Sequence, residues 1–185
     1  MRLESSEVGW GEPASIAAGE ATKKKTKGCY MYSKTLVVGW ADMDFNAHMG
    51  AAAYLVKCFD VRMMYFAENG YPMGEFTRLR LGPVGMKDEL EYFSEVGLLD
   101  TIVVTMSLTG MSTDGSRWRL RQEVLRPDGK ACARLTSSGG WMDLAARKLA
   151  APPAALLALL KKVMVVDDFV ELPSSLKPAL WRAAE

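Results

Sequence analysis

The spacing of hydrophobic and polar positions predicts a strand, one long helix and then several more strands. Residues 33–40 (SKTLVVGW) are rich in β-branched and aromatic side chains, which favour a strand. Residues 50–68 are expected to form a helix because their Ala, Leu and Met residues favour it, and Asn69-Gly70 followed by Pro72 gives a stop signal. Apolar residues lie on nearly every face of this helix, so we expect a sheet to wrap it.

Further strands are expected at residues 81–93, 101–110, 116–126 and 130–144. The turn sequences STDGS and RPDGK separate the last three, and Asp-Gly is a strong hairpin signal because both residues tolerate the required backbone angles. These three strands should therefore form an antiparallel meander. Two prolines at 152 and 153 are positioned to start a short leucine-rich helix. This order of elements indicates the α+β fold class.

Residues 116–126 alternate with a period of two, which is the period of a strand with one buried face. Trp118, Leu120 and Val124 share one side and predict the buried face. The opposite, outward face carries three arginines, at positions 117, 119 and 121.

Length and composition favour one domain without strong electrostatic attraction to charged partners. The chain has 185 residues, with 23 Lys and Arg against 22 Asp and Glu, for a formal net charge of +1. This balance gives no reason to expect a nucleic-acid partner or a membrane surface. The three cysteines are far apart, which argues against a disulfide framework and a thiolate zinc site. Without a long apolar run or a signal peptide, a soluble, cytoplasmic protein is expected.

The two ends of the chain are weakly patterned. Residues 1–30 mix Gly, Ala, Ser, Glu and a lysine run, and we expect a flexible N-terminal extension there. Residues 31–165 form the expected domain, and residues 166–185 form a C-terminal tail that packs on or near it.

The only histidine lies in a polar stretch between the first expected strand and the helix. In an extended chain alternate side chains share a side, so Asp42, Asp44, Asn46 and His48 are expected to project together. The backbone N–H groups of the first helical turn, near residues 50–52, are unsatisfied donors able to hold a developing oxyanion. The stretch therefore combines carboxylates, an amide and an imidazole with an oxyanion-binding helix start.

Simpler interpretations of the same stretch compete with catalysis. A calcium loop fails because Ala47 stands where glycine is needed and Ala53 stands where the bidentate glutamate is needed. One histidine without a nearby thiolate offers too few ligands for a transition metal, so no metal is expected. In the structural alternative, Asp44 or Asn46 caps the helix and His48 is an ordinary turn residue.

Residues 40–54, WADMDFNAHMGAAAY, resemble the signature of the hotdog-fold acyl-CoA thioesterases related to 4-hydroxybenzoyl-CoA thioesterase. The usual form of that signature is D-x-D-x-N-G-H-V-N-N-A-x-Y, and its spacing is matched from Asp42 to Tyr54 without a gap. LEYFSEVGLLD at residues 90–100 and GWMDLAARKLAAPP at residues 140–153 resemble later strands of the family. The resemblance covers roughly residues 32–162.

The resemblance implies a long central helix wrapped by a curved antiparallel sheet, with active sites at the interface of a homodimer and dimers often joined into tetramers. It implies hydrolysis of an acyl-CoA thioester to a free acid and CoA without a bound cofactor. By position, Asp44 corresponds to the catalytic carboxylate of many members. Plant acyl-carrier-protein thioesterases share the D-x-N-x-H pattern, which adds Asn46 and His48 as catalytic partners.

Substrate positioning is expected at the helix start that follows these residues. Backbone groups at Gly50, Ala51 and Ala52 would hold the oxyanion, and Tyr54 would help to position the substrate. The acyl chain is expected in an apolar cleft lined by Tyr54, Cys58 and residues of the partner chain. The outward arginines are considered for the CoA phosphates, but no CoA-binding residue is assigned.

The sequence also departs from the family pattern in ways that keep two alternatives open. Ala47 replaces the usual glycine, Gly50 and Ala51 replace paired asparagines, and Glu95-Val96 replaces the Glu-Cys pair of the plant enzymes. One alternative is a non-catalytic hotdog protein that binds acyl thioesters. The other is a hotdog enoyl-CoA hydratase, whose usual D-x-N-P-x-H spacing is one residue longer than in this chain.

Arg62 lies inside the apolar helix. A buried arginine is usually paired, so we expect it to pair with a carboxylate rather than to contact substrate.

Overall fold

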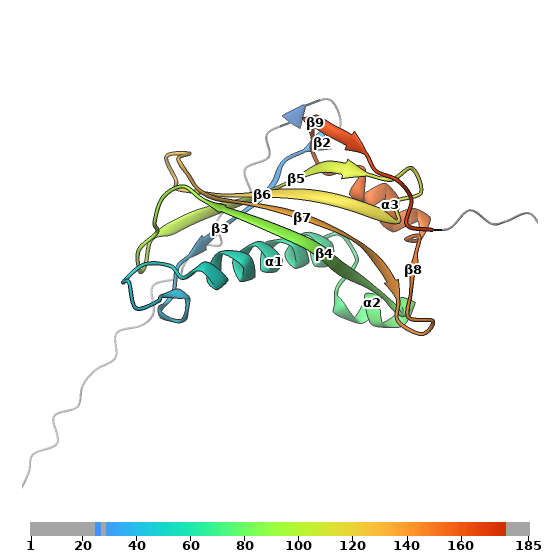
Figure 1. Cartoon of the computed structure of the whole chain (residues 1–185), viewed down its shortest axis with the longest axis horizontal. Helices are drawn as coiled ribbons and strands as arrows, with labels where there is room; N and C mark the ends of the chain where they lie inside the picture. The colour runs from blue at the N-terminus through green and yellow to red at the C-terminus, as the bar shows by residue number, and fades with distance from the viewer. Residues whose placement is uncertain (1–24, 27–28, 177–185) are drawn as a thin grey trace, which may run out of the picture.

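The fold is a curved antiparallel sheet that bends around one long helix (Figure 1). The computed structural model describes residues 25–26 and 29–176. Five strands form the main path of the sheet in the order β3-β5-β6-β7-β4. Their bounds are Tyr32–Val37 for β3, Leu81–Tyr92 for β4, Thr101–Met111 for β5, Arg117–Leu125 for β6 and Ala131–Asp143 for β7. These five strands and their α+β arrangement confirm the predictions from sequence.

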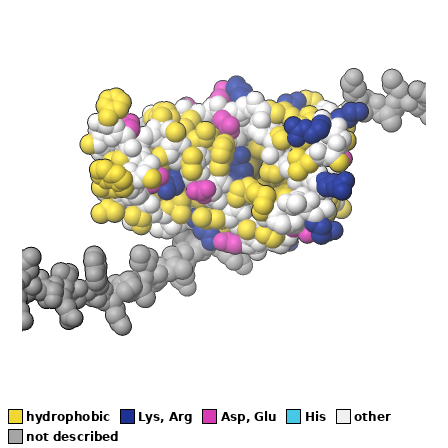
Figure 2. Space-filling view, turned by 90° about the horizontal axis from the view of Figure 1, so that it is seen from below, with side chains coloured by type: hydrophobic (Ala, Val, Ile, Leu, Met, Phe, Trp, Pro, Cys, Tyr) yellow, Lys and Arg dark blue, Asp and Glu magenta, His cyan; other side chains and the backbone are white. Residues whose placement is uncertain are grey.

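The central helix α1, Ala51–Glu68, lies against the concave side of this sheet (Figure 1). Its sheet-facing side chains are completely buried, as Cys58 and Tyr65 show with 0% exposure. On the other side of the helix, Val56 is 52% exposed and Met64 is 37% exposed. The sheet therefore wraps the helix as predicted, and the face of the helix turned away from the sheet stays uncovered in the single chain. Figure 2 shows hydrophobic side chains on this open face.

Smaller elements close the ends of the sheet. Helix α2, Met73–Leu79, follows α1, and strand β8, Lys148–Ala150, pairs with β7. Helix α3, Ala154–Leu160, is the short helix predicted after the two prolines. Of these elements, α2 and β8 were not expected from sequence, because each is too short to show a clear period.

The two weakly patterned ends contain short strands. The two-residue strands β1, Lys25–Thr26, and β2, Cys29–Tyr30, pair with each other outside the main sheet. The rest of the expected extension lies outside the described residues. After α3, strand β9, Val165–Glu171, runs parallel to β5. Among the described residues, no helix is both long enough and apolar enough to cross a membrane.

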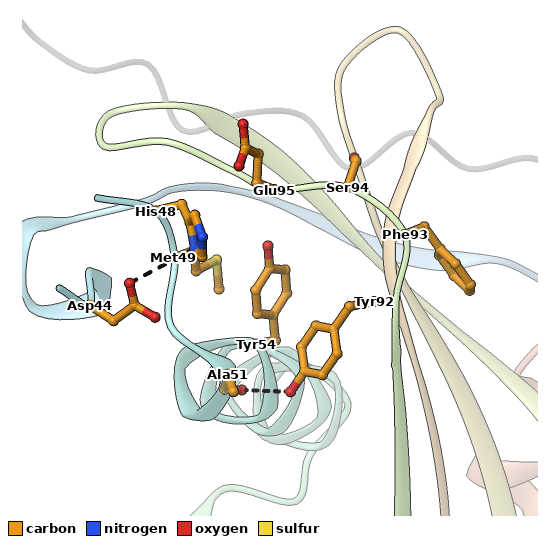
Figure 3. A pocket seen from close by; sticks show the side chains of 9 residues that line it. All are labelled: Asp44, His48, Met49, Ala51, Tyr54, Tyr92, Phe93, Ser94 and Glu95. Atoms are coloured by element: carbon orange, nitrogen blue, oxygen red, sulfur yellow. Dashed lines mark hydrogen bonds and ion pairs between the residues drawn. The ribbon is translucent and has the colours of Figure 1, made fainter. Parts of the chain in front are cut away.

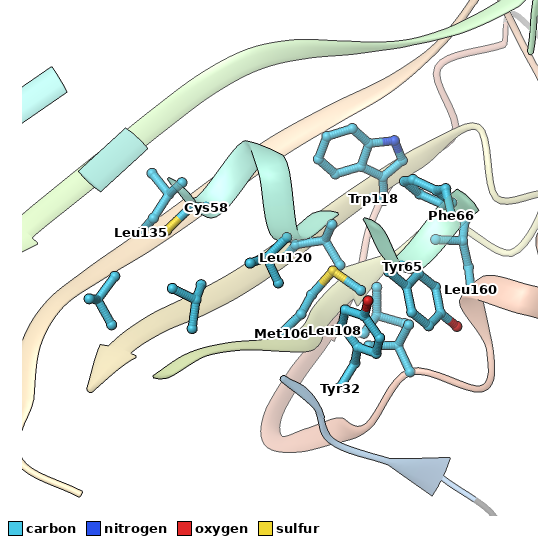
Figure 4. Close-up of a cluster of buried hydrophobic side chains, with 14 of the residues drawn as sticks. Tyr32, Cys58, Tyr65, Phe66, Met106, Leu108, Trp118, Leu120, Leu135 and Leu160 are labelled. Atoms are coloured by element: carbon cyan, nitrogen blue, oxygen red, sulfur yellow. The ribbon is translucent and has the colours of Figure 1, made fainter. Parts of the chain in front are cut away.

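The core between sheet and helix follows the alternation seen in the sequence. Trp118, Leu120 and Val124 are at most 2% exposed, whereas the arginines between them face outward. Figure 4 shows Trp118 and Leu120 packed with side chains of α1 and the neighbouring strands. The predicted Asp-Gly turns are also present, since Gly115 and Gly129 adopt φ angles of 69° and 88°. Positive φ is the conformation that glycine adopts most easily.

One glycine in the sheet is required for this packing. A Cβ atom at Gly139 would lie 2.2 Å from the carbonyl oxygen of Val84 and 2.5 Å from the Trp118 ring. Neither neighbour is free to move, because Val84 belongs to the β4–β7 ladder and the Trp118 ring is buried and donates a hydrogen bond to Gly140 O at 3.2 Å.

We therefore expect Gly139→Ala to lower the free energy of unfolding by about 1–3 kcal/mol through overpacking. The matched control is Gly74→Ala in α2, where a Cβ atom meets nothing within 4 Å. Alanine favours helix over glycine, so this control should gain about 0.5–1 kcal/mol. Urea denaturation of both variants measures the difference, and equal stabilities would contradict the packing at Gly139.

Candidate active site

The polar stretch before α1 is folded back on itself and is not extended. The 3-10 helix η1, Trp40–Asp42, and a turn at residues 45–46 interrupt it. The Asp42 carboxylate accepts a hydrogen bond from the backbone N–H of Gly39 at 2.8 Å and pairs with Lys57 Nζ at 2.8 Å. The prediction that four alternate side chains project together is therefore wrong. Asp42 has a structural role, because it fixes η1 to the helix.

The turn brings Asp44 and His48 together. Asp44 Oδ1 accepts a hydrogen bond from the backbone N–H of Asn46 at 2.8 Å, and the Asp44 N–H donates to the His48 carbonyl oxygen at 3.0 Å. His48 Nδ1 lies 3.9 Å from Asp44 Oδ1, with both side chains about one-third exposed. Asn46 is itself exposed, and its side-chain amide reaches Asp44 Oδ2 at 3.4 Å. Asn46 therefore supports the Asp44 carboxylate from the solvent side.

The first turn of α1 is open next to this carboxylate. Gly50 is the N-cap, and no side chain caps the helix, so the structural alternative in which Asp44 or Asn46 is the cap is wrong. Among the described residues, no acceptor binds the backbone N–H groups of Ala51 and Ala52. A Cβ atom at Gly50 would lie 3.3 Å from the Cβ of Asp44. Glycine at this position therefore allows the carboxylate to lie close to the helix start.

A pocket of about 360 Å³ opens beside Asp44 (Figure 3). Its volume is within the usual range for small-molecule sites, about 300–1,000 Å³. Four of the residues proposed from sequence line it: Asp44, His48, Ala51 and Tyr54. The other lining residues are Met49, Tyr92, Phe93, Ser94 and Glu95.

The predicted positions do not all face this pocket. Asn46, Gly50 and Ala52 are adjacent to it in sequence but do not line it. Asn46 instead lines a second, polar pocket of about 300 Å³ together with His48 and Arg126. His48 thus lies between the two pockets.

Two tyrosines form one wall of the pocket beside Asp44. Tyr54 is 3% exposed, and its ring packs edge to face against Tyr92 at a centroid distance of 5.5 Å. Burial, with the nearby Cys132 and Tyr92, raises the pKa of Tyr54 to about 12. Tyr54 is therefore a neutral phenol near pH 7 and offers an O–H donor to a ligand. The Tyr92 hydroxyl donates to the carbonyl oxygen of Ala51 at 3.4 Å.

Sequence reasoning missed the segment at the end of β4 that closes the pocket, residues 92–95. Its signal is two consecutive aromatics, Tyr92 and Phe93, where a one-faced strand would alternate. Both are about half exposed. The segment reaches the helix start because Met49 N–H donates to the carbonyl oxygen of Val96 at 2.8 Å.

One sequence expectation about substrate contacts is not met. Cys58 does not line the pocket, and burial raises the pKa of its thiol to about 12, which makes it unreactive. The arginines considered for CoA phosphates are partly engaged within the chain. Arg121 forms an ion pair with Asp168 of β9, and Arg119 Nε donates to the Thr109 hydroxyl at 3.2 Å.

The fold is that of the hotdog thioesterases. Residues 38–160 match the Thioesterase-like superfamily, and the chain belongs to that family. No curated protein matches its sequence.

Solved structures show the same fold at low sequence identity. A hypothetical protein from Staphylococcus aureus, solved in complex with CoA, has a TM-score of 0.68 and 19% identity, over 88% of this chain and 99% of that chain. A 1,4-dihydroxy-2-naphthoyl-CoA thioesterase from Synechocystis has a TM-score of 0.64 and 14% identity, over 71% of this chain and 96% of that chain. A putative oleoyl thioesterase from Lactobacillus plantarum has a TM-score of 0.68 and 13% identity, over 86% of this chain and 60% of that chain.

Ala47 is strained, at the position where the signature that this stretch resembles has glycine. Its φ angle is 64°, in the left-handed region. That conformation costs an L-residue with a Cβ atom about 1–2 kcal/mol. The turn that carries Asp44 therefore forms with alanine, but at an energetic cost.

We expect Ala47→Gly to raise the free energy of unfolding by about 0.5–1 kcal/mol, because relief of strain exceeds the added entropy of the unfolded chain. Thermal unfolding measures the change. Ala145→Gly is the control, since residue 145 is exposed in a turn and has no positive φ, and it should lose about 0.4–1 kcal/mol. A destabilised Ala47→Gly variant would contradict the strain.

Proposed function

We propose that the protein hydrolyses an acyl-CoA thioester to a free carboxylic acid and CoA, with Asp44 as the reactive carboxylate. The observation that carries this proposal is the carboxylate beside an uncapped helix start, at the edge of a ligand-sized pocket. Water supplies the oxygen added to the acyl carbon, the C–S bond breaks, and the thiolate of CoA takes up a proton. Asp44 either removes a proton from this water or attacks the carbonyl itself to form a mixed anhydride.

The N–H groups of Ala51 and Ala52 are proposed to bind the thioester carbonyl oxygen as it gains negative charge. They are suited to this role because no residue in the described part of the chain accepts a hydrogen bond from them, and because they lie at the positive end of the α1 dipole. Each donor that is already in place at a developing oxyanion stabilises the transition state by about 3–4 kcal/mol. Gly50 contributes by letting Asp44 approach the same point.

His48 and Asn46 are proposed to hold the Asp44 carboxylate in position. Asn46 donates to both carboxylate oxygens, and the His48 ring lies near Oδ1. Tyr54, as a neutral phenol, is proposed to orient the substrate in the pocket. Two structural neighbours are thioesterases for CoA thioesters, 1,4-dihydroxy-2-naphthoyl-CoA and gentisyl-CoA, which supports this class of substrate.

The active form is proposed to be a homodimer, with dimers able to join into tetramers. In the described part of the chain, β4 pairs with β7 on one side only, so its other edge is open to a second copy. The open face of α1 adjoins this edge and carries exposed Val56, while Met86 on β4 is 44% exposed. Pairing of two copies here would cover both surfaces and close the pockets.

Asp44→Asn is expected to lower acyl-CoA hydrolysis by about 10²–10⁴-fold, because the amide neither takes a proton nor attacks the thioester. Release of free thiol from a panel of acyl-CoAs measures the rate, and the absorbance of enoyl-CoAs is followed in parallel. Asp167→Asn on exposed β9 is the control and should retain the wild-type rate.

Three outcomes would contradict the proposal. An unchanged rate in Asp44→Asn would remove Asp44 from the chemistry. Loss of enoyl absorbance without thiol release would indicate a hydratase. Acyl-CoA binding without either reaction would indicate a non-catalytic binding protein.

Val56→Asp is expected to dissociate the dimer, because it buries a charge in the proposed contact. Sedimentation equilibrium should give two or four times the 20.3 kDa chain mass for the wild type, and a variant that no longer forms this contact should lose the corresponding twofold association. Val165→Asp on β9 is the control, since Val165 is similarly exposed at 44% but lies away from α1. A monomeric wild type would contradict the dimer.

A further inference from the structure

The second pocket, which we call the polar pocket, adjoins the pocket beside Asp44. It has a volume of about 300 Å³. His48 and Glu95 line both pockets, so these two side chains form the boundary between them (Figure 3). The rest of its lining comes from the loop before α1, the loop between β4 and β5, and Arg126, which follows β6.

The lining of the polar pocket suits water better than the anionic part of CoA. Arg126 is already engaged, because its Nη2 donates to the Glu95 carbonyl oxygen at 2.6 Å and its Nη1 lies 3.8 Å from Asp100 Oδ2. The carboxylates of Glu95 and Asp100 outnumber this one guanidinium, which is unfavourable for phosphate groups. A roomy site with several hydrogen-bonding side chains is the kind of site that holds water.

The polar pocket reaches the Asp44 carboxylate through two side chains. Asn46 lines this pocket, and its side-chain amide donates to Asp44 Oδ2 at 3.4 Å. His48 Nδ1 lies 3.9 Å from Asp44 Oδ1, so the imidazole ring borders both the carboxylate and the polar pocket. An imidazole ring has two nitrogens and can take up a proton on one side and release it on the other.

The proposed dimer contact leaves the polar pocket open. None of the described residues that line it belongs to β4 or α1, whose open edge and open face would meet the second copy. The pocket beside Asp44, by contrast, is lined by Tyr54 of α1 and Tyr92 of β4. Asn46 and Glu95 of the polar pocket are exposed. A second copy and a bound acyl thioester would therefore close the pocket beside Asp44 and leave the polar pocket in contact with solvent.

We propose that the polar pocket is a second entrance to the Asp44 carboxylate, through which water arrives and a proton leaves while the acyl thioester occupies the other pocket. This inference rests on the proposed thioester hydrolysis. The oxygen of the water is added to the acyl carbon as the C–S bond breaks. One proton of the water goes to the thiolate of CoA. The other leaves when the acid product ionises, and His48 passes it from Asp44 to the polar pocket.

The test uses His48 as the reporter, because it is the only histidine of the chain. Diethyl pyrocarbonate modifies imidazole rings, and mass spectrometry of the peptide that contains His48 measures the rate. S-hexyl-CoA, a thioether without a cleavable carbonyl, fills the pocket beside Asp44. In the wild type His48 should still be modified when S-hexyl-CoA is bound, because the reagent enters through the polar pocket.

Gly97→Leu narrows the polar pocket and leaves the other pocket intact. A Cβ atom at Gly97 would make ordinary contact with the Asp100 carboxylate, 3.4 Å from Oδ2, and Gly97 has no positive φ. With S-hexyl-CoA bound, the variant should lose about 10-fold in the rate of His48 modification, since both entrances are then filled. In hydrolysis it should lower kcat by about 10- to 100-fold and leave KM nearly unchanged.

Two further variants control for altered folding. Arg126→Ala widens the polar pocket and should raise the rate of His48 modification, the opposite of Gly97→Leu. Gly74→Leu lies in α2, where a Cβ atom meets nothing within 4 Å, and it should behave like the wild type. Circular dichroism checks that each variant is folded.

The outcomes separate this inference from the proposed function. Complete protection of His48 by S-hexyl-CoA in the wild type, or equal modification rates in Gly97→Leu, Arg126→Ala and the wild type, would overturn the second entrance. A wild type that hydrolyses no acyl-CoA would overturn thioester hydrolysis instead. The opposite shifts of Gly97→Leu and Arg126→Ala in the free protein would then still decide whether the polar pocket gives access to His48.

Discussion

The connection between the start of α1 and the sheet is the constraint on which the site depends. Met49 N–H donates to Val96 O at 2.8 Å, and Gly50 N–H donates to Asp42 O at 2.8 Å, immediately before the first helical turn. These bonds occupy the N–H groups of Met49 and Gly50. The next two N–H groups, of Ala51 and Ala52, donate to no residue in the described part of the chain. The bond between Met49 and Val96 also holds the segment that follows β4 over the helix start, where Tyr92 to Glu95 form a wall of the pocket.

The helix that begins there is half covered by its own chain. Its inner side packs on the sheet through Cys58, Val61 and Tyr65, which are all completely buried, while Val56 remains exposed. Apolar surface of this kind on a helix is stabilised when a second chain covers it. The buried Arg62 is a further consequence of the geometry, since its guanidinium faces the sheet, where its hydrogen-bond partners among residues 29–176 are the neutral side chains of Gln122 and Ser137.

Much of the fold was predictable because the hydrophobic pattern of each strand and of the helix can be read within a short stretch of sequence. The alternation of Trp118, Leu120 and Val124, the two Asp-Gly turns and the long apolar helix each appear within a short window. The folded loop before α1 was not predictable, since the ion pair of Asp42 with Lys57 joins residues fifteen positions apart and replaces the expected extended chain. For the site, Asp44, His48, Ala51 and Tyr54 were identified through the family signature. Glu95 was missed as a lining residue because only tertiary contacts bring the end of β4 to the helix.

The start of α1 is proposed to polarise a thioester carbonyl beside Asp44. This proposal is tested most directly by the infrared carbonyl stretch of a ¹³C-labelled acyl-CoA bound to the Asp44→Asn variant. Two preorganised N–H donors should move this band below its frequency in water, because they draw more electron density from the C=O bond than mobile solvent does. A bound thioester whose band lies at or above its frequency in water would contradict the account.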